Sequence, residues 1–269
     1  MSAAPTRQNN AALRALFSFP AVAVSASTAL TVPEMPAPKE VTGDRELDAV
    51  LWLQECVATG HPDLIAKALD AAKRIKTPMA QLADRYDKYL LSRSGGNIIA
   101  AVFGSMSFGK LESRAKDAVD RLAQRHRALS MFGTVDNLLS DTRAEVACKV
   151  ALYGLKRRTT NFLPKYNTDK ADARFLAQPA LAPHSLEDCL HSMQYLTELY
   201  WLRHKTVENA GDHWPAVQEY EDFCFRQLAH IRPRSEAEAL AVLDSLDADS
   251  IQRTEVPAIL RNLVSGGWA

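Results

Sequence analysis

The sequence has few of the short patterns that fix a chemistry. Its four cysteines include no CxxC pair, which argues against a zinc ribbon or a thioredoxin-type site. No GxSxG motif marks a nucleophilic serine. Gly109 precedes Lys110, but no Ser or Thr follows that lysine, so we expect no phosphate-binding loop. No run of about 18 uncharged apolar residues occurs, so we expect no membrane-spanning helix.

The cysteines themselves stand far apart in the chain. A protein of 269 residues needs no disulfides for stability, so we interpret the cysteines as buried free thiols in a reducing compartment and predict a cytoplasmic protein. The N-terminus leaves an alternative open, because Arg7 and Arg14 precede a short apolar run and Val24-x-Ala26 fits a cleavage site. In that alternative the protein is secreted through a signal peptide that ends near Ala26. The four cysteines are Cys56, Cys148, Cys189 and Cys224.

Strand-like alternation of apolar and polar residues is missing, whereas helical spacing and helix-capping patterns recur. The sequence therefore predicts an all-α fold, a multi-helix assembly with two helical subdomains as a variant. Residues 1–42 are rich in Ala, Ser, Thr and Pro and are expected to form a disordered arm. The uncharged segment 97–109 fits a buried helix or a glycine-punctuated loop. We expect helices at about 44–59, 63–76, 78–91, 110–131, 135–160 (with a break near Ser140), 185–209, 215–231, 235–246 and 256–264, and a polar loop at 161–185.

A formal net charge of zero conceals a segregation of charge along the chain. Residues 1–64 carry 4 basic and 7 acidic side chains, residues 65–175 carry 21 and 11, and residues 176–269 carry 7 and 14. We therefore divide the chain into the arm 1–42, a basic helical region 43–175 and an acidic helical region 176–269, the last two of which can also form one domain. Such a basic region meets something anionic: nucleic acid, a phosphorylated ligand or the chain's own acidic third.

The most suggestive run of cations lies at the end of the basic region. Four aromatic residues are interleaved with it: Tyr153, Phe162, Tyr166 and Phe175. Cations neutralise phosphates and aromatic rings stack on unpaired bases, so this run favours contact with nucleic acid. In the alternative interpretation the cations cap a helix end and the rings anchor a loop. The candidate nucleic-acid-binding residues are Lys149, Lys156, Arg157, Arg158, Lys165, Lys170 and Arg174.

A second candidate site is the Arg-x4-His spacing that joins Arg121 and His126 inside an expected helix. This spacing resembles the motif of HEPN-type ribonucleases, in which Arg and His of two subunits meet at a dimer groove and cleave RNA without a metal. The resemblance covers six residues, and Leu122 stands where the family usually has a polar residue. It implies that Arg121 and His126 are catalytic. The alternative is an ordinary charged helix face.

Histidines and aromatic residues gather in the acidic region. Glu187/His191 and His204/Glu208 are four residues apart, a spacing that can serve a metal on facing helices but also decorates surfaces. Only Asp188 gives a carboxylate-x-x-His spacing, so we expect no metal and no other cofactor. The aromatic residues are expected to form the packed centre of this region. They are Tyr195, Tyr200, Trp201, Trp214, Tyr220, Phe223 and Phe225.

Together these patterns favour a non-enzymatic, soluble, intracellular helical protein that acts by binding. Its basic middle is expected to contact an anionic partner, with nucleic acid as the main candidate, or another protein. One alternative is a HEPN-like, metal-independent ribonuclease that uses Arg121 and His126. Another is a self-assembling structural protein in which basic and acidic surfaces of neighbouring copies meet head to tail.

Overall fold

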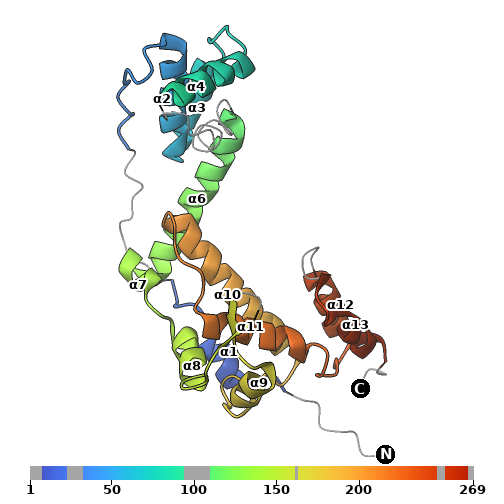
Figure 1. Cartoon of the computed structure of the whole chain (residues 1–269). Coiled ribbons are helices and arrows are strands. Elements are labelled where there is room, and N and C mark those ends of the chain that lie inside the picture. The colour runs from blue at the N-terminus through green and yellow to red at the C-terminus, as the bar shows by residue number, and fades with distance from the viewer. Residues whose placement is uncertain (1–7, 23–32, 94–109, 161–162, 247–251, 266–269) are drawn as a thin grey trace, which may run out of the picture. The chain divides into compact units, whose positions relative to one another are not determined.

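The computed structural model describes residues 8–22, 33–93, 110–160, 163–246 and 252–265 (Figure 1). Within those ranges the regular secondary structure is helical except for one two-stranded hairpin, which confirms the all-α prediction. The segment 97–109 and parts of the expected arm, residues 1–7 and 23–32, lie outside the described residues.

Contacts divide the chain into two compact units. The inserted unit consists of Ala23–Ser130, and the discontinuous unit combines Met1–Val22 with Met131–Ala269. These limits differ from the charge-based regions, which were divided at residues 42 and 175. Charge patterning reflects the surface, whereas contacts reflect the apolar core, so the two divisions need not coincide.

The inserted unit forms where strong local signals mark each helix. Asp44 caps the first helix by accepting hydrogen bonds from the backbone N–H groups of Glu46 and Leu47. Proline occupies the first turn of the second helix, where its missing N–H costs nothing. The helices are α2 (Arg45–Ala58), α3 (Pro62–Ala72), α4 (Met79–Arg93) and α6 (Leu111–Phe132), whose last two residues belong to the discontinuous unit.

Small and aliphatic side chains make up the core of the inserted unit. Leu53 and Val57 of α2 pack with Ile65 of α3 and with Leu111 at the start of α6. The turn between α2 and α3 approaches α6 so closely that a Cβ on Gly60 would lie 2.7 Å from a backbone carbonyl oxygen of α6. Gly60 also has a φ of +70°, so both space and backbone conformation require glycine there.

The discontinuous unit contains a hairpin that the sequence analysis did not predict. The helix expected at 135–160 consists of two short helices followed by a strand, and the expected loop 161–185 contains a second strand and a helix. Gly154, with a φ of +73°, lies where the helical conformation has ended. The elements are α1 (Ala11–Leu16), α7 (Val135–Leu139), α8 (Arg143–Ala151), β1 (Arg158–Thr160), β2 (Leu163–Lys165), α9 (Thr168–Leu176), α10 (Leu186–Thr206), α11 (Pro215–Gln227), α12 (Glu236–Ser245) and α13 (Val256–Val264).

Aromatic rings form the centre of the discontinuous unit. Tyr220 lies between Phe17, whose ring is stacked at a centroid distance of 5.0 Å, and Phe175, whose ring is perpendicular at 5.1 Å. The predicted aromatic core is therefore present at Tyr220, but the prediction is wrong for two of its members. Trp201 is 52% exposed and Trp214 is 55% exposed.

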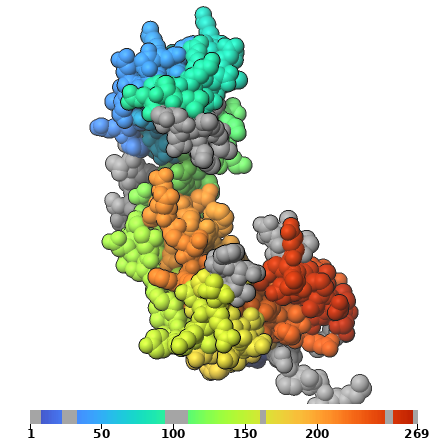
Figure 2. Space-filling model, in the orientation of Figure 1, coloured from blue at the N-terminus to red at the C-terminus, as the bar shows by residue number. Residues whose placement is uncertain are grey.

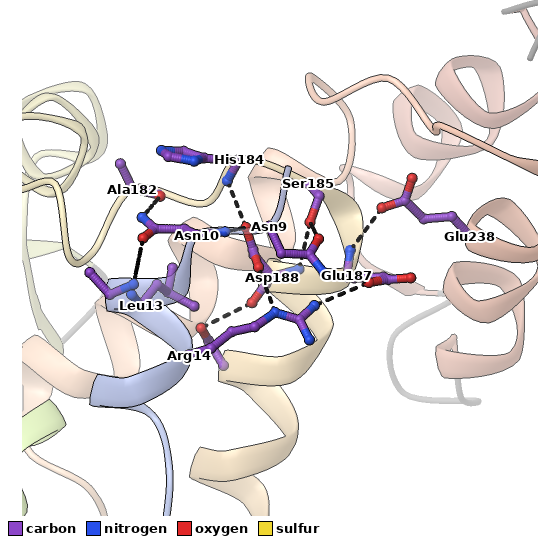
Figure 3. Close-up of polar contacts among 12 residues, drawn as sticks. Asn9, Asn10, Leu13, Arg14, Ala182, His184, Ser185, Glu187, Asp188 and Glu238 are labelled. Carbon is purple, nitrogen blue, oxygen red and sulfur yellow. Dashed lines mark hydrogen bonds and ion pairs between the residues drawn. The ribbon is translucent and has the colours of Figure 1, made fainter. Parts of the chain in front are cut away.

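The N-terminal segment differs from the expected arm, because residues 8–22 contribute buried side chains to this core. Leu13 and Phe17 are buried, and the segment is held by a polar network at the start of α10 (Figure 3). The buried carboxylate of Asp188 accepts hydrogen bonds from the backbone N–H of Asn10 at 2.8 Å and from Arg14 Nε at 3.0 Å. The Asn10 side chain donates in turn to the carbonyl oxygen of Ala182 at 2.8 Å.

A second buried ionic cluster joins α8 to α10. Both carboxylate oxygens of Glu145 accept hydrogen bonds from the guanidinium of Arg203, at 2.7 and 2.9 Å. Arg203 also donates to the carbonyl oxygen of Leu138 at 2.9 Å. Burial alone would raise the pKa of Glu145, but hydrogen bonds from His213, Arg203 and the Thr142 backbone hold that pKa well below its ordinary value. The carboxylate of Glu145 is therefore ionised at neutral pH.

Candidate anion-binding surface

The hairpin places two cations directly opposite each other. Strands β1 and β2 are antiparallel, and their register pairs Arg158 with Lys165. Side chains paired in this way lie on the same face with Cβ atoms about 4.5–5.5 Å apart, and like charges at that separation repel. An anion bound between the two side chains would relieve the repulsion.

Three more cations flank this pair, and together the five define the basic hairpin surface. Its members are Lys156, Arg157, Arg158, Lys165 and Lys170, and all five are exposed. None of them forms an ion pair with any acidic group in the described ranges. Figure 2 shows the yellow region around residues 163–176 at the molecular surface. This region therefore offers cations that no acidic side chain among the described residues neutralises.

The other two predicted binding residues have internal partners instead. Lys149 pairs with Asp141, and its ammonium lies 4.5 Å from the ring centroid of Trp214. Arg174 donates to the carbonyl oxygens of Ala151 and Tyr153, at 3.4 and 2.6 Å, just after α8 ends. For Arg174 the alternative interpretation, a cation that caps a helix end, describes the structure.

The interleaved aromatic residues also fall into separate groups. Phe175 belongs to the core, and Phe162 lies outside the described residues. Tyr153 is 85% exposed on the turn after α8. Tyr166 is half-buried, and the guanidinium of Arg157 lies 5.9 Å from its ring centroid. Two of the four rings are therefore close to the basic hairpin surface, Tyr166 through its contact with Arg157 and Tyr153 by its position three residues before Lys156.

Ion pairs between the basic and acidic regions do not neutralise these cations. Among the described residues, no cation between 149 and 174 pairs with an acidic group beyond residue 176. An ion pair of the opposite sense is present instead, in which a cation of the acidic region pairs with an acidic residue of the basic region: Arg226 of α11 with Asp172 of α9. The described acidic groups of the last third, the third candidate partner of the sequence analysis, thus form no ion pair with this surface.

Arg121 and His126 both lie on α6, where Arg121 is exposed and His126 is half-buried. Five residues along an α-helix correspond to a rotation of about 140°, so the two side chains point from different sides of α6. Within the described part of the chain no contact joins them. The ribonuclease hypothesis stays a prediction.

In the histidine-rich part of the chain, the acidic residue that could serve as a metal ligand makes structural hydrogen bonds instead. Asp188, the acidic residue of the only carboxylate-x-x-His spacing, is occupied by hydrogen bonds from the N-terminal segment. In the described ranges, no three His, Cys, Asp or Glu side chains gather as metal ligands would.

The four cysteines are free and buried, as the sequence analysis predicted. Burial raises the pKa of the Cys224 thiol to about 12, which makes that thiol a poor nucleophile.

The pairing of Arg158 with Lys165 was not foreseen, because the sequence was read as a helix that runs into a loop. A local signal was nevertheless present. Two β-branched residues, Thr159 and Thr160, precede Asn161, a residue type that favours turns. The strands are too short for sustained alternation, so only the turn signal could have indicated a hairpin.

Comparison of the chain with protein-family models, with curated proteins and with solved structures found no match. None of the helices in the described ranges combines the length and the apolar character needed to cross a bilayer.

Proposed function

We propose that this protein acts by binding and that the basic hairpin surface holds a nucleic acid through its phosphates. The observation that carries the proposal is the like-charged cross-strand pair of Arg158 and Lys165, which has no acidic partner among the described residues. Bound phosphate groups supply negative charge at regular spacing, which suits several separate cations better than one small ion does.

The backbone of a nucleic acid also matches the composition of the surface. Arginine donates two parallel hydrogen bonds to a phosphate, and lysine contacts it as a point charge. Contacts of this kind carry no sequence information. The expected activity is therefore affinity for many sequences, with strong dependence on salt concentration.

The decisive experiment measures the binding of a fluorescent oligonucleotide by anisotropy over a series of salt concentrations. Combined replacement of Lys156, Arg157 and Arg158 with alanine should weaken binding to all sequences alike. It should also flatten the slope of log K against log salt by about two to three units, since each lost phosphate contact removes roughly 0.7–0.9 of a unit.

A matched control removes the same charge from the inserted unit. Lys67, Lys73 and Arg74 are exposed on and just after α3, and their combined replacement with alanine should leave the affinity and the slope unchanged. Equal loss in both variants, or no binding by the parent protein at low salt, would overturn the proposal. Competition by poly-glutamate as effective as competition by nucleic acid would indicate an acidic protein as the partner and would overturn it as well.

We also propose that the mature protein keeps residues 8–22 and is cytoplasmic. Cleavage near Ala26 would remove Leu13 and Phe17, both buried, from the core of the discontinuous unit. It would also leave the buried carboxylate of Asp188 without two of its donors. Intact-mass measurement of the protein purified from its own cells should show these residues retained; a chain that starts after Ala26 would contradict the proposal.

A further inference from the structure

We infer that the nucleic acid bound by the basic hairpin surface is single-stranded, and that Tyr153 and the Tyr166–Arg157 pair stack on its unpaired bases. This inference rests on the proposed function and specifies its ligand. The reason for it is that phosphate contact alone gives no role to the two aromatic residues near the five cations, Tyr153 and Tyr166.

Tyr153 is presented to solvent from a fixed backbone. Its ring is 85% exposed, while its backbone N–H donates to the carbonyl oxygen of Val150 at 3.1 Å and its own carbonyl oxygen accepts from Arg174 at 2.6 Å. Because the backbone is already fixed, stacking of the ring on a base would restrict only the side-chain torsions of Tyr153. The arrangement therefore resembles a stacking platform more than a loop anchor, which would bury the ring.

The position of Tyr153 relative to the cations also fits a nucleotide. Only Gly154 and Leu155 separate Tyr153 from Lys156, so the Cα atoms of Tyr153 and Lys156 are at most about 10 Å apart. A base on the ring and its neighbouring phosphates near the lysine can thus belong to adjacent nucleotides. The basic hairpin surface and Tyr153 would then act on one strand.

Tyr166 and Arg157 provide a second flat surface. The guanidinium lies 5.9 Å from the ring centroid, and both groups are types on which unpaired bases stack. In a duplex each base face is already covered by its neighbours, so exposed rings have nothing to stack on. Duplex DNA could engage a two-stranded ribbon in its major groove, but that contact would use base edges and would not explain Tyr153.

The test compares a labelled 20-nucleotide DNA of mixed sequence with the duplex that contains it, at the same salt concentration. We expect the single strand to bind more tightly than the duplex. Replacement of Tyr153 with leucine should weaken single-strand binding by roughly 5- to 100-fold, the range for loss of one stacked base, and leave duplex binding unchanged. Y153F should bind like the parent protein, because phenylalanine keeps the ring.

Trp201, another exposed aromatic residue of the same unit, provides the matched control, and W201L should not change the affinity. The salt slope should stay constant in Y153L, which separates stacking from phosphate contact. Equal or tighter binding of the duplex, or equal weakening of both ligands by Y153L, would overturn the inference. In either case the proposed function would survive if the Lys156, Arg157 and Arg158 variant still loses affinity and salt slope; it fails separately if neither ligand binds at low salt.

Discussion

The two units hold their helices together by different means. The inserted unit packs apolar stripes of helices that follow one another in the chain, and of its described residues only His61 is a buried polar residue. The discontinuous unit has an aromatic core and in addition buries four charged residues, Glu145, Arg203, Asp188 and Glu238. Helices close in sequence meet with little choice of partner. The discontinuous unit joins segments that are far apart in sequence, and we interpret its buried ion pairs as contacts that fix one arrangement of these segments more than they add net stability.

The largest effect is expected where the discontinuous unit depends on a buried charge. Glu145→Ala leaves the guanidinium of Arg203 buried without its carboxylate, so it should lower the free energy of unfolding of that unit by about 3–5 kcal/mol. Hydrogen exchange read by mass spectrometry reports each unit separately. In the inserted unit, Asp70→Ala removes an exposed carboxylate paired with Lys73 and Arg74 and should change stability by less than about 1 kcal/mol.

The inserted unit should fail through loss of apolar packing. Leu82 of α4 is fully buried, and Leu82→Ala should cost about 2–5 kcal/mol, measured by urea unfolding. Leu91 of the same helix is 40% exposed, so Leu91→Ala should cost much less. Similar losses at both positions would show that α4 does not contribute to this core as described.

Acid should affect the discontinuous unit through Asp188. Burial by itself would raise the pKa of this carboxyl group, but hydrogen bonds from Asn10, Arg14 and His184 lower it below the ordinary value of 3.8. A carboxyl group whose folded pKa is lowered contributes stability above its unfolded pKa, and that stability is lost as the pH falls through the folded pKa. We expect this contribution to be complete at pH 7 and to be lost progressively as the pH falls below about 4.

The variant that tests this pH dependence is Asp188→Asn, which should lower stability at pH 7 and show a weaker dependence of stability on pH below about pH 4. Hydrogen exchange at residues 8–22 would report the release of the N-terminal segment. Unchanged protection of that segment in the variant would contradict the role given to Asp188.

A smaller effect than those at Glu145 and Leu82 is expected at the start of α2. Asp44→Ala removes the cap of α2 and an exposed ion pair with Arg85, and should cost about 1 kcal/mol in urea unfolding. High salt should narrow the difference between parent and variant, because it screens the pair with Arg85. If Asp44→Ala lowered the free energy of unfolding as much as Glu145→Ala does, the proposed difference between the two units, apolar packing in one and buried ion pairs in the other, would be contradicted.

Sequence patterns predicted the parts of the fold that depend on neighbouring residues. The cap at Asp44 and the turn after Thr59 placed α2 within a residue of its observed bounds, and the helix 256–264 was placed correctly. Helix α1 was missed because it has only six residues and its Asn10 cap is held by Asp188, far along the chain. The candidate cations were found from composition, but which of them have partners depends on tertiary contacts such as that of Lys149 with Trp214.

The discontinuity of one unit also has a consequence for synthesis on the ribosome. The N-terminal segment that carries Leu13 and Phe17 leaves the ribosome first, yet its partners on α10 and α11 follow the whole inserted unit. Because synthesis proceeds at about 5–20 residues per second, these apolar side chains stay without their partners on α10 and α11 for on the order of ten seconds or more. The inserted unit can fold during that interval, so the order of folding would reverse the order of the chain.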